Sequence, residues 1–183
     1  MKGIEIDFFD GVYEPAEDSW IMCKFLPNKL GTVLEIGCGS GIISIHLAKK
    51  GNIVTSVDIN PKAVKATKAN AKKNDAKLEV FESNMFENLE GRKFDSIVCN
   101  PPYLPPTDGY EDYELALAVE GGPTGSEFTI ELLSKAKQFL NNNGAVYLIT
   151  SSKMKNFSVD WKRKVLHQEN FFFERLMLSL IHI

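Results

Sequence analysis

The chain has 183 residues, of which 44% are hydrophobic and 25% charged, and its formal net charge at pH 7 is −3. These values predict one globular domain over residues 1–183 and argue against an autonomous nucleic-acid binder, which usually carries a basic face. No apolar run approaches the ~20 residues of a membrane span, the N-terminus is too acidic for a signal peptide, and three scattered cysteines favour a reducing cytoplasm without a zinc site.

The first third of the chain predicts a strand, a glycine loop and a helix. Residues 4–9 form a candidate short strand and residues 15–26 a candidate helix. A buried strand is expected at 32–36, and G-C-G-S-G at 37–41 follows it directly, before a helix. The loop lacks both the G-K-[ST] ending of a P-loop and the third glycine position of a dinucleotide fingerprint. Because Glu35 can meet an ammonium group, the loop favours a zwitterionic amino-acid ligand over a diphosphate.

Two further strand ends predict the rest of a ligand. Residues 53–57 read as a strand closed by Asp58, an acid about 20 positions after the glycine loop and therefore placed to bind a ribose diol. A third strand is expected at 77–81, followed by Asn84, which can meet an adenine amine, and Met85, which can flank the ring. Amino acid, ribose and adenine together describe S-adenosylmethionine.

The most informative segment is Asn100-Pro101-Pro102-Tyr103, directly after a predicted buried strand at 94–99. The two prolines fix the loop and remove two N–H donors. The Asn100 side-chain oxygen and the Pro101 carbonyl can then accept from one planar NH2 group, with Tyr103 lying over its plane. Such a clamp frees the lone pair of a conjugated nitrogen for attack, and the stabilisation develops in the transition state.

The C-terminal part is predicted in coarser outline. The stretch 104–125, which contains Asp108, Glu111, Asp112 and Glu114, is expected to be a substrate-side loop. A helix within 125–140 is expected to end at 141–144, before a strand at 145–149 and an antiparallel pair at 159–167 and 171–181. The run Phe171-Phe172-Phe173 is expected to belong to the core. Cys99 is interpreted as a small buried residue because no histidine stands in a recognisable arrangement with it.

Four segments carry a family resemblance, and a fifth is weaker. The four are VYEPAEDS at 12–19, LEIGCGSG at 34–41, DINPKA at 58–63 and NPPY at 100–103, and the fifth is E-G-G-x-x-G at 120–125. Together they resemble class I S-adenosylmethionine-dependent methyltransferases of the HemK type. Within that type the chain is similar to the archaeal and eukaryotic branch that methylates the glutamine of the GGQ motif in class-1 release factors.

The resemblance implies a fold and a set of site residues. The fold is a Rossmann-like α/β domain with a seven-stranded mixed sheet of order 3-2-1-4-5-7-6 and helices on both faces. The residues implied at the cofactor are Ser19, Glu35, Gly37, Asp58, Asn84, Met85 and Asn100. Those implied in catalysis are Asn100, Pro101 and Tyr103, with no metal. Asn84 departs from the aspartate common in the family, although an amide oxygen can still accept from an adenine amine.

The resemblance also implies the reaction and its partners. The expected activity is N5-methylation of a release-factor glutamine in the cytoplasm. A small zinc-binding activator is expected to form a heterodimer through the edge strand 77–81. The second possibility is a nucleic-acid methyltransferase acting on an adenine or guanine amine. A non-catalytic scaffold is disfavoured by the intact NPPY and Asp58, and a nicotinamide oxidoreductase by Glu35 and the missing glycine position.

Overall fold

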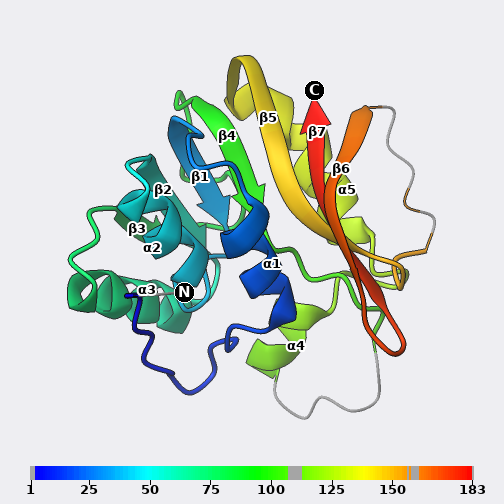
Figure 1. Ribbon diagram of the computed structural model, residues 1–183, viewed down its shortest axis with the longest axis horizontal. Coiled ribbons are helices and arrows are strands. Elements are labelled where there is room, and N and C mark those ends of the chain that lie inside the picture. The colour runs from blue at the N-terminus through cyan, green and yellow to red at the C-terminus, as the bar shows by residue number, and fades with distance from the viewer. Residues whose placement is uncertain (1–2, 107–112, 156, 158–160, 183) are drawn as a thin grey trace.

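The computed structural model describes residues 3–106, 113–155, 157 and 161–182. One seven-stranded sheet in the order β3-β2-β1-β4-β5-β7-β6 organises the chain (Figure 1). Its strands are β1 (Thr32–Ile36), β2 (Ile53–Asp58), β3 (Glu79–Glu82), β4 (Phe94–Cys99), β5 (Leu140–Ser151), β6 (Lys162–Asn170) and β7 (Arg175–His182). β7 runs antiparallel to β5 and β6, while the other neighbours are parallel. The predicted fold class and strand order are confirmed.

Helices cover both faces of the sheet (Figure 1). They are α1 (Glu17–Phe25), α2 (Ile42–Lys49), α3 (Pro61–Lys73), α4 (Tyr113–Val119) and α5 (Glu127–Ala136), with a 3-10 turn at Lys137–Phe139. The start of α3 follows from its sequence, because the Asn60 side chain accepts a hydrogen bond from the Lys62 N–H and Pro61 stands at the first helical position. No helix among the described residues is long and apolar enough to cross a bilayer.

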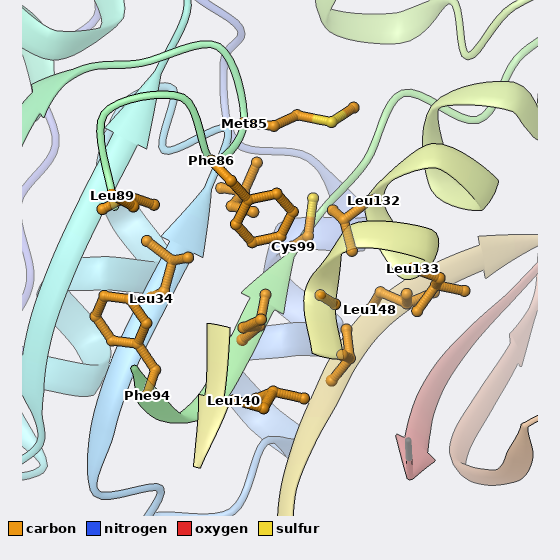
Figure 2. Packing of buried hydrophobic residues seen from close by; sticks show 14 of the residues in the cluster. Leu34, Met85, Phe86, Leu89, Phe94, Cys99, Leu132, Leu133, Leu140 and Leu148 are labelled. Atoms are coloured by element: carbon orange, nitrogen blue, oxygen red, sulfur yellow. The ribbon is translucent and has the colours of Figure 1, made fainter. Parts of the chain in front are cut away.

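Strand alternation divides the core into two clusters. Leu34 and Ile36 of β1 point to one face and Val33 to the other, as the two-residue period of a strand requires. The Val33 side packs against α1 and α2. On the opposite side, Figure 2 shows Leu132 of α5 and Phe86 of the loop after β3 lying over Cys99. The parallel strands are therefore apolar on both faces and hold their carboxyl ends rigidly.

The predicted strand at 4–9 is wrong. These residues are extended but pair with no strand. Asn70 of α3 accepts from the N–H of Asp7 and donates to its carbonyl, and Asn74, which caps the end of α3, makes the same pair of bonds with Glu5. The two amides thus replace a neighbouring strand, and they tie the N-terminal segment to α3.

Several predicted boundaries also move. β3 begins and ends later than the predicted 77–81, and residues 141–144 lie inside β5 instead of ending a helix. There the β4–β5 register shifts between Phe94 and Ser96, and Asn143 has a φ of 64°, so the extra residues are absorbed as a bulge. The final antiparallel pair is confirmed as β6 and β7, although residue 159 lies outside the described residues.

Two interpretations of apolar and acidic segments need correction. Phe171 packs at the edge of the core, but Phe172 and Phe173 are 92% and 77% exposed, so the run does not belong to the core as a whole. The stretch 104–125 is not only a loop, because its Leu-Ala-Leu-Ala-Val run forms α4. The predicted acids Asp108, Glu111 and Asp112, and the side chain of Glu114, lie outside the described residues.

Candidate active site

A cavity of about 310 Å³ opens at the carboxyl ends of β1, β2 and β4. Ligands of open α/β sheets bind at this edge. All nine residues predicted for the site line this cavity: Ser19, Glu35, Gly37, Asp58, Asn84, Met85, Asn100, Pro101 and Tyr103. The structure therefore brings together residues from four separate motifs, while their individual roles remain predictions.

Glu35 occupies the floor of the cavity. Its carboxylate contacts the Ser44 hydroxyl, which in turn contacts the Ser56 hydroxyl. The side chain is fully buried, and this burial raises its pKa to about 8 even though Ser44 favours the charged form. Glu35 therefore holds a proton near neutral pH until a cation approaches it.

Asp58 and the glycine loop form one hydrogen-bonded unit. The Asp58 carboxylate accepts from the Gly39 N–H and the Asn60 N–H, each at 2.9 Å. Burial raises its pKa, and these backbone donors oppose the shift. A Cβ atom built on Gly37 would meet no atom within 4 Å, so a ligand can approach the backbone there. The carboxylate keeps free lone pairs for further donors such as ribose hydroxyls.

Asn84 and Met85, the two residues predicted to meet adenine, line the cavity after β3. Met85 is buried and has a φ of 47°, a conformation that turns the chain after β3 toward the cavity. The amide nitrogen of Asn84 donates to Glu87 at 2.9 Å. This contact orients the Asn84 amide and leaves its oxygen as the acceptor that an exocyclic amine requires.

Asn100 presents an acceptor that nothing in the described chain satisfies. It follows β4 directly, and its Oδ1 atom is buried without a hydrogen-bond partner among the described residues. Such an orphan acceptor costs about 1–3 kcal/mol in a folded protein. Asn100 is among the residues that line the cavity, and a ligand N–H that reaches Oδ1 would relieve this cost. Burial also raises the pKa of the adjacent Cys99 thiol, which keeps that thiol neutral, as the core interpretation of Cys99 requires.

Sequence reasoning missed Asp18 and Tyr13. Asp18 is buried, and its Oδ2 accepts from the hydroxyls of Tyr13 and Tyr103, each at 3.1 Å. Its Oδ1 accepts from the N–H of Ser19 at 2.6 Å. Burial first, and then the nearby Asp18 charge, raise the pKa of Tyr103, so its hydroxyl stays a donor. The signal was present in the motif at 12–19, where Asp18 directly precedes the predicted Ser19.

The weak E-G-G-x-x-G segment supports the NPPY loop from behind. A Cβ at Gly121 would lie 2.4 Å from the Pro102 carbonyl oxygen, and one at Gly125 would lie 2.4 Å from that of Tyr103. The two segments are joined by a hydrogen bond of 2.9 Å from the Gly121 N–H to the Leu104 carbonyl. Only glycine allows this approach, so the segment fixes the position of the clamp.

The charges of the cavity indicate the kind of ligand. Its lining includes the carboxyl groups of Asp18, Glu35 and Asp58, and no lysine or arginine among the described residues. Such a site attracts a cation and repels a phosphate. S-adenosylmethionine carries two positive charges, on its ammonium and its sulfonium. Its ammonium group suits Glu35, its ribose hydroxyls suit Asp58, and Asn100 offers a further acceptor. The residues present therefore fit this cofactor.

Comparison with known proteins gives the same answer. The family model described as "Methyltransferase small domain" matches residues 16–117. The chain belongs to this methyltransferase family. The predicted enzyme class, an S-adenosylmethionine-dependent methyltransferase of the HemK type, is confirmed at the level of the family.

Two relatives of this methyltransferase carry names that specify a substrate. The chain is 44% identical over 155 residues to a provisionally named protein N5-glutamine methyltransferase of Methanocaldococcus jannaschii, covering 83% of this chain and 78% of the relative. It is 38% identical over 154 residues to a release factor glutamine methyltransferase of Aquifex aeolicus, covering 75% of this chain and 54% of the relative. The chain thus spans about half the length of the bacterial enzyme.

A solved structure shows that the fold also supports other acceptors. The Thermus thermophilus 16S rRNA N2 G1207 methyltransferase, solved with AdoMet and guanosine, superposes with a TM-score of 0.63 at 20% identity, covering 91% of this methyltransferase and 43% of that chain. At this identity the likeness concerns the fold alone.

Proposed function

We propose that this methyltransferase transfers a methyl group to the N5 nitrogen of the glutamine in the GGQ motif of a class-1 release factor. The observation that carries the proposal is the buried, unpartnered Oδ1 atom of Asn100, a residue that lines the acidic cavity together with Pro101. Both relatives named above, with identities of 44% and 38%, are called glutamine methyltransferases. Residues 1–183 act in this proposal as one domain in the cytoplasm.

Residues of this chain activate the acceptor nitrogen of the glutamine for attack. Asn100 Oδ1 and the Pro101 carbonyl accept the two protons of the acceptor NH2 group, and the Tyr103 ring covers its plane. These two hydrogen bonds draw the nitrogen toward a tetrahedral geometry and localise its lone pair. Because the nitrogen becomes tetrahedral only as it attacks, the two bonds are stronger in the transition state than in the ground state. After the new C–N bond forms, the nitrogen is acidic and loses one proton to solvent, so a buried general base is not needed.

The cofactor is placed by the other half of the cavity. When bound, S-adenosylmethionine supplies a methyl group on a positively charged sulfonium. Glu35 faces its ammonium group, Asp58 its ribose hydroxyls, and Asn84 with Met85 its adenine. Ser19 lies beside the Asp18 carboxylate at the opposite wall. This arrangement positions donor and acceptor at the rim of one rigid sheet, which is the larger part of the expected acceleration.

A methyl-transfer assay separates the possible acceptors. Purified chain is incubated with isotope-labelled S-adenosylmethionine and, in parallel, a class-1 release factor, double-stranded DNA and ribosomal RNA. We expect label on the release factor alone, and peptide mass spectrometry should place it on the GGQ glutamine. A release factor whose GGQ glutamine is replaced by asparagine is the matched control and should stay unlabelled. Label on DNA or RNA with an unlabelled release factor contradicts the proposal and favours the exocyclic-amine alternative.

We also propose that a small zinc-binding activator pairs with the open edge of β3. β3 is the outermost strand, and the Ser83 N–H donates to the Asp58 carbonyl on β2. Because alternate residues of a parallel strand bond to one neighbour, the N–H and C=O of Val80 face away from β2. The Glu82 carbonyl is already bonded to the Asn88 side chain. An open edge of this kind is a template for strand addition.

The activator proposal is tested with two proline variants. Val80→Pro removes a donor that faces outward, whereas Phe81 bonds inward to β2, so Phe81→Pro is the control that damages the sheet itself. We expect the isolated chain to be poorly soluble or to bind cofactor weakly, and co-expression with the activator to correct this. Val80→Pro should abolish co-purification and lower the melting temperature less than Phe81→Pro does, although Val80 also packs in a small core cluster with Cys38 and Val64. An isolated chain that is monodisperse, fully active and indifferent to the activator contradicts the proposal.

A further inference from the structure

The turn between β6 and β7 exposes two adjacent phenylalanines. Phe172 and Phe173 are 92% and 77% exposed, and their rings meet edge to face with centroids 4.5 Å apart. The neighbouring Phe171 instead packs against the core cluster under α1. The first ring therefore anchors the turn, and the next two project from it.

The residues of this turn differ from those that a two-residue hairpin loop favours. The Phe171 N–H donates to the Glu174 carbonyl at 2.6 Å, which closes a two-residue connection after the last β6–β7 pair. Two-residue hairpin loops favour Asn-Gly or another glycine pair with positive φ. Here neither phenylalanine has a positive φ. Apart from their contact with each other, the two large apolar side chains stay mostly exposed, and natural sequences break local rules of this kind mainly at functional sites.

The turn lies on the substrate side of the molecule. β1 and β4 point toward the same end of the sheet at which the β6–β7 hairpin turns (Figure 1). The Ser151 hydroxyl at the end of β5 contacts the Glu174 carboxylate, and the Ser152 N–H donates to the Arg175 carbonyl at 2.9 Å. The charge of Glu174 contributes, after burial, Asp18 and Tyr13, to the raised pKa of Tyr103. The hairpin is thus joined to the end of β5, and its Phe171 packs against the same core cluster as Tyr103 of the clamp.

The charges around the tip favour a protein over a nucleic acid. Glu169 and Glu174 flank the phenylalanines, Arg175 follows them, and Lys153 stands beside the end of β5 that holds the tip, so these acidic and basic side chains balance. A phosphate backbone would meet no excess of positive charge on these residues. Exposed aromatic rings on a rigid loop are typical anchors of protein interfaces.

From these observations we propose that Phe172 and Phe173 dock an apolar surface of the protein substrate beside its acceptor glutamine. This inference rests on the proposed function and adds a surface by which the enzyme recognises a folded protein substrate. The rings act outside the cavity, so they contribute to substrate affinity and leave the chemical step unchanged. Burying most of two exposed rings should tighten binding roughly 30- to 1000-fold before ordering costs.

The test compares steady-state constants of the double variant Phe172→Ala, Phe173→Ala with those of the wild type, using purified class-1 release factor. We expect KM for the release factor to rise at least tenfold, with kcat at saturation and the Kd for S-adenosylhomocysteine within twofold. Ile53→Ala is the matched control, because Ile53 is 72% exposed at the amino-terminal start of β2, on the far end of the sheet. Its KM should not change.

The outcomes separate this inference from the proposed function. If the wild type does not methylate the release factor, the proposed function fails first. If it does, and the double variant keeps KM within twofold, the docking inference is overturned while the proposed function stands. A double variant that loses affinity for an RNA oligonucleotide but not for the release factor also overturns it. Equal melting temperatures of the three proteins establish that the comparison concerns binding and not folding.

Discussion

The hydroxyl of Tyr103 donates a hydrogen bond of 3.1 Å to Oδ2 of Asp18, although the two residues stand 85 positions apart. This bond joins the motif at 12–19 to NPPY. It fixes the tyrosine ring by its far end, so the ring can lie over an acceptor amide without choosing among rotamers. The two motifs therefore act as one unit, and Asp18 is a positioning residue for the clamp.

Tyr103→Phe should lower kcat about tenfold, because it keeps the ring but loses a hydrogen bond to a carboxylate worth about 1.5 kcal/mol. Tyr13→Phe is the matched control, since it removes a bond to the same oxygen and leaves Tyr103 in place. Its kcat should stay within threefold. Single-turnover rates at saturating cofactor measure both, and equal losses in the two variants would show that Asp18 does not act through Tyr103.

Asn100→Ala should abolish turnover while changing the Kd of the cofactor by less than about tenfold. The side chain is proposed to act chiefly on the acceptor amide, and losing one such polar stabiliser costs on the order of 3 kcal/mol, or more than a hundredfold in rate. Calorimetry with S-adenosylhomocysteine and single-turnover kinetics give the two quantities. The variant should also be no less stable, because it removes an unpaired buried acceptor. Retention of half the activity would falsify the role.

Asp58→Ala should weaken S-adenosylmethionine and S-adenosylhomocysteine alike. A carboxylate that holds ribose hydroxyls contributes charge-assisted bonds of roughly 1.5–3 kcal/mol each, and both ligands share the ribose. The variant also frees the Gly39 and Asn60 N–H groups, so the glycine loop loses its support. Isothermal titration with each ligand is the measurement. If Asp58→Ala weakens the binding of only one of the two ligands, Asp58 does not bind the ribose that they share.

The strand pattern and the cavity residues could be predicted because they depend on local chemistry. β1 at 32–36 and β4 at 94–99 are short segments rich in apolar residues, and the site residues stand at or directly after their carboxyl ends. The N-terminal segment could not be predicted, because Asn70 and Asn74 pair with it from more than 60 positions away. Single-sequence patterns carry no signal for such tertiary contacts.

The errors at 104–125 and at Phe171-Phe172-Phe173 have a common cause. Hydrophobicity alone does not distinguish a residue that packs in the core from one that faces a ligand or a partner. Leu117 and Val119 of α4 line the cavity, and Phe172 lies outside the core. In both places apolar side chains stand at the functional edge of the sheet, where local rules are weakest.

Gly125→Ala should inactivate the enzyme by moving the NPPY loop. Its Cβ would stand 2.4 Å from the Tyr103 carbonyl oxygen, a backbone atom that cannot rotate away. Gly51→Ala is the control, because Gly51 has a similar positive φ of 88° and open space around its Cβ position. Both variants carry the cost of a side chain in the left-handed region, about 1 kcal/mol of unfolding free energy, and Gly125→Ala adds the clash with the Tyr103 backbone. Only Gly125→Ala should lose more than tenfold in kcat; equal activity of the two variants rules out the proposed support of NPPY.

Glu35 should make cofactor binding depend on pH. Its pKa is raised from 4.5 to about 8 by burial, so the free protein holds a proton there that a bound ammonium group must displace. Binding therefore releases a proton, and affinity should rise up to tenfold per pH unit from pH 6 to about 7.5. Above this the ligand's own α-amino group, with a pKa of about 8, begins to lose its charge.

The raised pKa of Glu35 also determines the direction in which the free energy of unfolding changes with pH. The unfolded chain releases the Glu35 proton near pH 4.5 and the folded chain near pH 8, so this residue's contribution to the free energy of unfolding is fully present below pH 4.5 and is lost as pH rises to about 8. Glu35→Gln cannot titrate. It should bind the cofactor more weakly with no pH slope between 6 and 7.5, and the unliganded variant should unfold with a smaller loss of stability between pH 5 and 8. Calorimetric titrations and urea unfolding across this range measure both. A wild-type affinity that is flat from pH 6 to 7.5 would mean that Glu35 is already ionised in the free protein.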